Sequence, residues 1–415
     1  MKEVFYAGRL RPFKHVGHHP QFEHIHIPPP GYRFTTSGAI QAGNYVRVMR
    51  SIIRLSRDSL TNGSTVKDLF RFIDSRSVRA QMCLPAADLV FLPSTPFILG
   101  QAPWVIEIED TTTLFAPFPR VQGKRVNPRL SGLDGVYDSG FYPAVKALLE
   151  SDNCRGIICH VASTANSIPI LFKNPKLAEK ISHIPLGIAP RPERDSSVRE
   201  EVITLLFTNS WHQGATGFYL RGGLDLLEAY SKLHSEHPRI RLIIRSKLPD
   251  DLDHRYRRII KQCNVEVIDK FLPVNEIEAL FRSADIYVLP SARLHVVSIL
   301  QAMAHSLPIV ASDGWGIKEY IDDGRNGLIV PGRYGTCSWM DNNGMLKEDY
   351  RPLLSANVTF ANALTDTLST LINDKEMRRH LGQTGRRDVE AKFSIQQWNS
   401  GLADAFNKAL ARVAE

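Results

Sequence analysis

The stretch that decides the fold runs Leu289-Pro-Ser-Ala-Arg-Leu-His-Val-Val-Ser-Ile-Leu-Gln-Ala-Met-Ala-His-Ser-Leu-Pro-Ile-Val-Ala-Ser-Asp-Gly-Trp-Gly316. Its start completes an apolar segment, Ile286–Leu289, which predicts a buried strand ending at a proline. Ser298–Ala304 predicts a helix, and Pro308–Ser312 predicts a second strand. Strand, helix and strand in this order are typical of a parallel sheet in an α/β domain.

The same alternation extends in both directions from this stretch. Further strands are predicted at Val4–Tyr6, 22–27, Asp88–Ser94, Trp104–Asp110, Gly156–His160, Ile203–Thr208, Arg241–Arg245 and Val265–Ile268. Helices are predicted within 41–80 and at Gly223–His234, Asn275–Ser283, Phe360–Asn373 and Gln396–Ala414. A proline-rich linker is predicted at Pro185–Arg199 and a polar insertion at 333–357.

This organisation predicts an α/β protein with two doubly wound, Rossmann-like domains facing a central cleft. We expect an N-terminal domain at 1–185, a second domain at 186–390, and a C-terminal helix at 391–415 that crosses back to the first. In doubly wound sheets, ligands bind beside the carboxyl ends of the strands. The length of 415 residues fits two or three domains.

Composition limits the class of protein. Hydrophobic residues make up 43% and charged residues 23%, which is typical of soluble globular chains rather than disordered ones. No window approaches 18 uninterrupted apolar residues, so no membrane-spanning helix is expected, and the N-terminus lacks the apolar region of a signal peptide. A net charge of +8 favours an anionic ligand or surface without choosing one.

Cysteines and histidines give no metal template. The five cysteines form no CxxC pair, which argues against a zinc site and favours a reducing compartment. Histidines gather at positions 15, 18, 19, 24 and 26, but their spacing matches no zinc site. We therefore expect no metal ion.

The helix that follows Pro290 starts near Val297, and its exposed backbone N–H groups suit a phosphate. Gln301 lies on its first turns, where its amide can hold sugar hydroxyls, and His295 precedes it. Glycines in Asp313-Gly-Trp-Gly316 permit a close backbone approach to a ligand. Two ordinary strand-to-helix turns of a doubly wound fold remain the alternative.

Taken from Pro290 to Pro331, the sequence resembles the nucleotide-sugar motif of the group 1 family of retaining glycosyltransferases, which have the two-domain GT-B fold. The resemblance also covers the helix start at Arg221-Gly222, the strand Ala284–Ser291, and Gly382–Phe393 followed by Trp398. It is good over 185–415 and only architectural before that. Two family glutamates, eight positions apart, correspond here to Arg293 and Gln301.

The resemblance implies a donor site and a catalytic pair. The implied donor-binding residues are Asn209, Arg221, Lys247, His295, Val296, Val297 and Gln301. Arg221 stands where the family has its phosphate-binding lysine, and a cation at a helix start favours an anion nearby. Arg245 and Lys247, at the end of the next strand, could add positive charge. Glu109 and Asp110 stand where the family has a His-Asp pair, so they could orient an acceptor hydroxyl or act as a base. Capping of the next turn is the alternative for Asp110.

A basic stripe is predicted on a helix through 45–57. At about 100° per residue, Arg47, Arg50, Arg54 and Arg57 fall on one side, opposite a mainly apolar face. This pattern fits a helix lying on an anionic membrane. The alternative is a core-packing helix with a solvated arginine face.

The sequence therefore predicts a retaining, hexosyltransferase-like enzyme that moves a sugar from a UDP- or GDP-sugar to a sugar or lipid-linked acceptor in glycan, polysaccharide or glycolipid synthesis. The nucleotide-sugar is a substrate, and no cofactor is expected. We expect a cytoplasmic protein, peripheral at the inner membrane face, with no nucleic-acid partner. A nucleotide-sugar-binding protein of the same fold without turnover is the first alternative, and a nucleic-acid-binding protein is the second.

Overall fold

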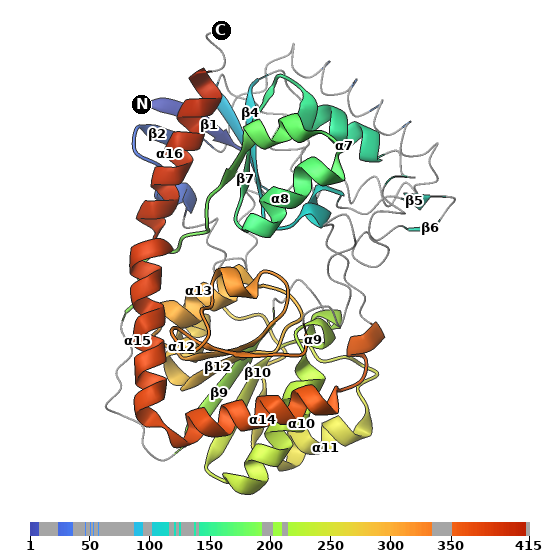
Figure 1. Cartoon of the computed structure of the whole chain (residues 1–415), viewed down its shortest axis with the longest axis vertical. Coiled ribbons are helices and arrows are strands. Elements are labelled where there is room, and N and C mark those ends of the chain that lie inside the picture. The colour runs from blue at the N-terminus through green and yellow to red at the C-terminus, as the bar shows by residue number, and fades with distance from the viewer. Residues whose placement is uncertain are drawn as a thin grey trace.

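The computed structural model describes residues 1–7, 24–35, 87–93, 102–115, 141–192, 202–209, 215–333 and 351–411, with isolated positions at 46, 50, 53, 57, 120, 121, 124, 125 and 137. These residues form two α/β units stacked along the long axis of the molecule (Figure 1). Each unit is built on a six-stranded parallel sheet. The predicted fold class, GT-B, is confirmed.

The sheet of the second unit has the order β11-β10-β9-β12-β13-β14. Its strands are β9 (Ile203–Thr208), β10 (Ile240–Arg245), β11 (Val265–Val267), β12 (Ile286–Leu289), β13 (Ile309–Ser312) and β14 (Leu328–Val330). The strand order reverses between β9 and β12, which makes the gap beyond their carboxyl ends the expected ligand crevice. The strands predicted from sequence in this region are all present, within one residue of their expected ends.

The sheet of the first unit has the order β2-β1-β3-β4-β7-β8. Its strands are β1 (Lys2–Tyr6), β2 (Tyr32–Thr35), β3 (Leu89–Pro93), β4 (Trp104–Ile108), β7 (Cys154–Cys159) and β8 (Ile181–His183). A separate two-stranded sheet pairs β5 (Arg120–Val121) with β6 (Lys124–Arg125). The strands predicted from three apolar runs in this unit are present as β3, β4 and β7. The runs are apolar throughout because both faces of a parallel sheet are covered.

The strand predicted at 22–27 is wrong over its described part. His24, Ile25 and His26 are helical. Tertiary contacts explain the difference, because the His24 ring donates to the carbonyl of Gly187 at 2.8 Å and stacks on Trp398. The alternation of histidine and isoleucine therefore reflects one buried histidine and not a strand with two faces.

Helices cover both sheets. They are α7 (Phe141–Glu150), α8 (Ala162–Leu171), α9 (Thr216–Leu220), α10 (Gly223–Glu236), α11 (His254–Gln262), α12 (Val274–Ser283), α13 (Val296–Ala304), α14 (Val358–Asn373), α15 (Lys375–Lys392) and α16 (Ile395–Ala411). Short 3₁₀ turns lie at Thr111–Phe115, Pro175–Lys180, Ile317–Glu319 and Arg351–Leu353. The predicted helices α10, α12, α13, α14 and α16 are present.

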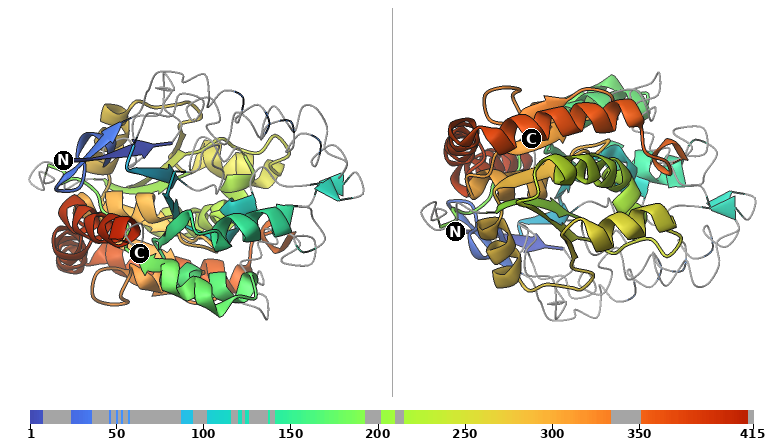
Figure 2. Two further views of the ribbon diagram at one scale, coloured as in Figure 1. Left: turned by 90° about the horizontal axis from the view of Figure 1, so that it is seen from above. Right: turned by 90° about the horizontal axis from the view of Figure 1, so that it is seen from below.

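The last two helices join the units. α15 packs on α13 of the second unit, whereas α16 packs on β7 and β4 of the first. Both helices run along one side of the molecule, as Figures 1 and 2 show. On α16 the Phe406 ring packs edge-on against Tyr32 and Phe91, and it is fully buried. Helix α16, near the end of the chain, thus completes the hydrophobic core of the first unit.

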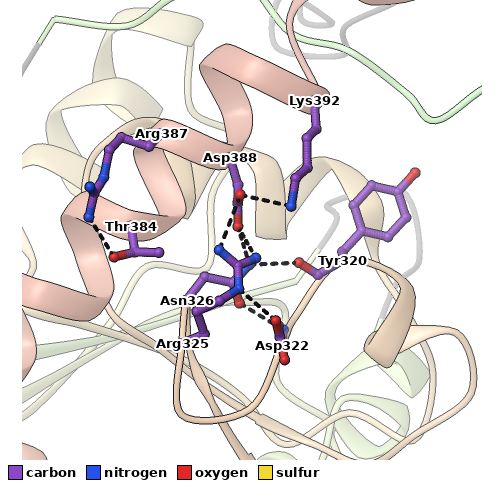
Figure 3. A network of polar contacts seen from close by, with 8 residues as sticks. All are labelled: Tyr320, Asp322, Arg325, Asn326, Thr384, Arg387, Asp388 and Lys392. Atoms are coloured by element: carbon purple, nitrogen blue, oxygen red, sulfur yellow. Dashed lines mark hydrogen bonds and ion pairs between the residues drawn. The ribbon is translucent and has the colours of Figure 1, made fainter.

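A polar network fixes α15 to the turn before β14 that contains Asp322, Arg325 and Asn326 (Figure 3). Arg325 donates to Asp388 at 2.5 Å and to Asp322 at 2.6 Å. Asn326 donates to the same Asp388 carboxylate at 2.7 Å, and Lys392 lies 3.0 Å from its other oxygen. Hydrogen bonds to a charged acceptor are the stronger kind, so this network orients the helix pair relative to the second sheet.

Several predictions fall wholly or partly outside the described residues. These include Arg47, Arg54, His15, His18, His19, Cys83, Cys337, the linker beyond residue 192, and 334–350 of the insertion. Of the described cysteines, Cys154 and Cys159 are buried free thiols. Over the described part of the chain no cluster of His, Cys, Asp and Glu has the form of a metal site, and no helix is long and apolar enough to cross a membrane.

Candidate donor-binding site

A cavity opens at the carboxyl ends of β9, β10 and β12, at the reversal of strand order. It encloses about 700 Å³ of empty space, part of it open to solvent. Its lining is formed by Glu109, Thr208, Asn209, Arg221, Arg245, Ile277, Phe281, Arg293, His295, Val296, Val297, Ser298 and Gln301. The structure therefore brings together Glu109 and six of the seven residues predicted for donor binding.

Arg221 is held at the floor of this cavity by the turn that precedes α10. The next residue, Gly222, has a positive φ of 77°, and a Cβ there would lie 2.2 Å from the carbonyl oxygen of Pro290. Only glycine fits such a close approach. The guanidinium donates to the carbonyl of Thr208 at 2.8 Å and to the hydroxyl of Ser298 at 3.3 Å. Burial lowers the pKa of Arg221 to about 10, which leaves it charged near neutral pH.

A second buried arginine lies beside it. Arg245 is the last residue of β10, and its guanidinium donates to the backbone carbonyl of Asn209. The Asn209 amide donates in turn to the hydroxyl of Ser246 at 3.2 Å. Burial lowers the pKa of Arg245 as well. Arg245 ends β10, and the Arg221 guanidinium contacts the last residue of β9, so two fixed cations lie at neighbouring strand ends and suit a doubly charged anion.

Lys247 is the exception among the residues predicted for the donor. It is exposed and does not line the cavity. Because β10 ends at Arg245, side-chain alternation does not continue to Lys247, and the chain turns toward solvent. Of the two cations expected at the end of this strand, Arg245 lines the cavity and Lys247 does not.

The N-terminus of α13 forms another wall. His295 is the N-cap residue, and Val296 and Val297 begin the helix, one residue earlier than predicted. The first backbone N–H groups of a helix have no partner within it and point outward, so they suit phosphate oxygens. Gln301 lies further along the same helix, is buried, and also lines the cavity.

Across the cleft, β4 ends in the two predicted carboxylates, and they differ. Glu109 lines the cavity. The Asp110 carboxylate instead accepts from the Thr112 backbone N–H at 2.9 Å and forms an ion pair with Arg293 at 2.9 Å. It is buried and does not line the cavity, so it has the capping role that was the alternative prediction.

A further carboxylate on β4 is engaged within the first unit. Glu107 pairs with the His160 ring at 2.8 Å, and both are buried. The hydroxyl of Tyr6 is nearby: burial, together with the Glu107 charge, raises its pKa. Glu107 does not line the cavity, which leaves Glu109 as the acidic group facing the donor side.

Sequence reasoning did not assign a role to three polar lining residues, Thr208, Arg293 and Ser298, whereas Arg245 was expected to add positive charge together with Lys247. Thr208 and Arg245 end apolar strands, which is a usable signal in a doubly wound sheet. Arg293 was visible only as a departure from the family pattern. Its role depends on Asp110, which is far away in the sequence and close only in the folded chain.

With this geometry in hand, comparison with known proteins is informative. Residues 214–339 match the model of the glycosyl transferases group 1 family. This part of the chain is therefore a group 1 glycosyltransferase domain. The family region contains Arg221, Arg245, Arg293 and α13, so it holds the buried cations of the cavity.

Solved structures with similar folds include two glycosyltransferases that match along the whole chain. Sucrose-phosphate synthase of Thermosynechococcus elongatus has a TM-score of 0.58 and 15% identity, with 99% of both chains covered. The HepE protein of Anabaena, solved with UDP and glucose, has a TM-score of 0.57 and 12% identity, with 98% of this chain and 99% of that chain covered. At such low identity these likenesses show the fold.

Among curated relatives, D-inositol 3-phosphate glycosyltransferase of Pseudarthrobacter chlorophenolicus is 29% identical over 165 residues, 38% of each chain. MMP alpha-(1->4)-mannosyltransferase of Mycolicibacterium hassiacum is 26% identical over 258 residues, 61% of this chain and 54% of the relative. The matched part thus spans about two fifths of the first relative and about half of the second.

Proposed function

We propose that this glycosyltransferase family member moves a hexosyl group from a nucleoside diphosphate sugar to an acceptor hydroxyl, with retention of configuration, in glycan, polysaccharide or glycolipid synthesis. The observation that carries the proposal is the pair of buried cations, Arg221 and Arg245, beside the N-terminus of α13 in one cavity. A departing nucleoside diphosphate needs this kind of fixed positive charge.

Each part of the cavity has a proposed task. Arg221, Arg245 and the N–H groups of Val296 and Val297 hold the diphosphate. Gln301 accepts and donates hydrogen bonds to donor hydroxyls. Glu109, facing these groups from the first unit, orients the acceptor hydroxyl or receives its proton. We propose that no metal ion is needed, so turnover should survive EDTA.

The proposal is tested with a panel of UDP-, GDP- and ADP-sugars, measuring thermal shift and release of nucleoside diphosphate. UDP is the first probe, because HepE was solved with UDP and glucose. Stabilisation with nucleotide release supports the enzyme. Stabilisation without release from any donor, in the presence of a panel of sugar acceptors, supports a binding protein that has lost turnover. No stabilisation, together with duplex DNA binding, would replace both with a nucleic-acid role.

We also propose that the acceptor is lipid-linked and that the enzyme attaches to an anionic membrane on its cytoplasmic side. Positions 46, 50, 53 and 57 are helical and exposed, and at about 100° per residue they share one face. Arg50 and Arg57 alternate there with Val46 and Ile53, which are 53% and 62% exposed. Basic and apolar groups on one exposed face suit a bilayer surface.

Liposome co-sedimentation tests this attachment. Each basic residue near an anionic bilayer contributes about 1 kcal/mol, so changing Arg47, Arg50, Arg54 and Arg57 to glutamine should abolish most binding. Binding should also fall with salt, since exposed charges are screened within about 10 Å at 0.1 M. Equal partition of both proteins, or binding indifferent to lipid charge, would return this helix to an ordinary solvated face.

A further inference from the structure

The two units are joined across the cleft by a buried ion pair at the edge of the donor cavity. Arg293, in the loop after β12, donates to Asp110, at the end of β4, at 2.9 Å. The side chains are 5% and 2% exposed. Breaking such a pair leaves an uncompensated buried charge, so the units are strongly coupled at this point.

The Arg293 backbone is held by the glycine turn of the fold-deciding stretch. Leu294 donates to the Trp315 carbonyl at 2.7 Å, and Trp315 donates to the Ala292 carbonyl at 3.1 Å. A Cβ at Gly314 would lie 2.5 Å from the backbone of Ala292, so only glycine permits this contact. The loop therefore presents the guanidinium toward β4 in a fixed direction.

On the other side, the backbone around Glu109 is anchored at two points. The Glu109 carbonyl accepts from the Thr164 hydroxyl at 2.6 Å. The next residue, Asp110, is fixed by Thr112 through one oxygen and by Arg293 through the other. Glu109 is thus held through its own carbonyl and through the next residue, and its side chain lines the cavity. Its place at the cavity depends on the Arg293–Asp110 contact.

Another interdomain contact already holds the units together at a different place. The Glu319 carboxylate accepts from the backbone N–H groups of Ala162 at 2.6 Å and Ser163 at 3.1 Å, at the start of α8. The hydroxyl of Tyr320 donates to the His160 carbonyl at 2.9 Å. The Arg293–Asp110 pair is thus an additional contact at the donor cavity, beside the one carboxylate that faces the donor.

Resting on the proposed function, we infer that Arg293 is a positioning residue: through Asp110 it sets Glu109 against the donor cavity when the two units close, while Arg221 and Arg245 hold the diphosphate. In this chain an arginine thus performs interdomain alignment at a position where the resembled family has a glutamate. Donor affinity then depends on the second unit alone, whereas turnover depends on the alignment of both units.

The test compares Arg293→Gln, Arg293→Lys and Asp110→Asn with wild type. Because a misplacement of about 1 Å can lower turnover about 100-fold, kcat for nucleotide release should fall by about that factor in Arg293→Gln and Asp110→Asn. The Kd for UDP should stay within about threefold, since Arg221 and Arg245 remain. Arg293→Lys should recover part of kcat by keeping a cation opposite Asp110. The double variant should be no worse than either single one.

A matched control breaks an equally buried Arg–Asp pair away from the cavity. Arg333 pairs with Asp225 within the second unit, and the two side chains are 1% and 2% exposed. Arg333→Gln should lower the melting temperature as Arg293→Gln does, but keep kcat per folded molecule. A similar kcat loss in both variants would overturn the positioning role, because it would then be a loss of general stability.

Two other results also overturn the inference. One is a loss of UDP affinity in Arg293→Gln as large as in Arg221→Ala, which would make Arg293 a donor ligand. The other is a radius of gyration that is the same in UDP-bound Arg293→Gln as in wild type, measured by small-angle X-ray scattering. A cleft opened by loss of the ion pair would increase it. Wild-type turnover is measured first, and its absence counts against the proposed function. The scattering result does not depend on turnover, so it tests the role of the ion pair separately.

Discussion

The two α/β units contribute unequally to the cavity and to the core. The second unit supplies every cavity-lining residue except Glu109, and the sheet behind them is covered by helices of the same unit. The first unit supplies one carboxylate, and its sheet is completed by α16 from the far end of the chain. Among the described residues, most of the cavity wall therefore comes from one unit, whereas the opposite wall depends on long-range packing.

The largest effect is expected where α16 covers the first sheet. Phe406→Ala removes a fully buried ring that packs against Tyr32 and Phe91, and such a change costs about 3–5 kcal/mol. Hydrogen exchange should increase in β1, β3 and β4 while β9, β10 and β12 stay protected. Leu371→Ala, in α14 of the second unit, is the matched control and should reverse this pattern. Equal exchange in both units would show that they unfold as one.

The next effect concerns donor recognition within the second unit. Arg221→Ala should weaken UDP or GDP binding and lower turnover together, by a factor of about 10² to 10³, since removal of one charge-stabilising donor costs about 2.7–4 kcal/mol. Isothermal titration with the nucleotide that wild type binds measures the affinity. Arg255→Ala, at an exposed arginine on α11, serves as the control. Unchanged nucleotide affinity would remove Arg221 from the site.

A smaller effect is expected at Gln301. Loss of its amide in Gln301→Ala should raise the donor KM about tenfold, because one hydrogen bond contributes about 0.5–1.5 kcal/mol. Gln301→Glu should be tolerated, since a carboxylate accepts the same hydrogen bonds. Steady-state kinetics with the preferred donor measures both. If Gln301→Ala keeps the wild-type KM, α13 does not contact donor hydroxyls.

The smallest effect is a pH dependence of stability in the network of Figure 3. Burial opposes ionisation of Asp388, but hydrogen bonds from Arg325, Asn326 and Lys392 outweigh it and hold its pKa below the ordinary value. A carboxyl with a lowered folded-state pKa stabilises the fold above its unfolded pKa and loses this contribution as pH falls. Asp388→Asn should therefore cost about 1 kcal/mol at pH 7 and much less near pH 3. Denaturant unfolding at the two pH values checks this, and a constant difference would contradict it.

Local signals predicted the second unit well. Short apolar runs between turn residues were enough to predict its strands, because a strand buried on both faces has no polar side. Asn209, Arg221 and His295, which the family resemblance implied, all line the cavity, at the end of a strand or the start of a helix. Lys247 is exposed and lies outside the cavity lining, because β10 ends at Arg245.

The strand predicted at 22–27 failed for a different reason. His24 owes its conformation to Gly187 and Trp398, which are more than 160 residues away in the chain. Asp110 and Arg293 are 183 residues apart, and Asp110 pairs with Arg293 while the adjacent Glu109 lines the cavity. No pattern among neighbouring residues in the sequence predicts either the His24 contacts or the Arg293–Asp110 pair.

The amino-acid sequence alone determined the α/β class and the parallel second sheet, because these depend on hydrophobic periodicity and on turn residues close together in the chain. The likeness to the group 1 glycosyltransferases came from the resemblance of the stretch from Pro290 to Pro331. Only the tertiary structure decided that Glu109 and not Asp110 lines the cavity, and that Arg245 and not Lys247 does so. The physical reason is that burial and ion pairing depend on distances in space. Those distances are established only when the two units, joined by α15 and α16, come together across the cleft.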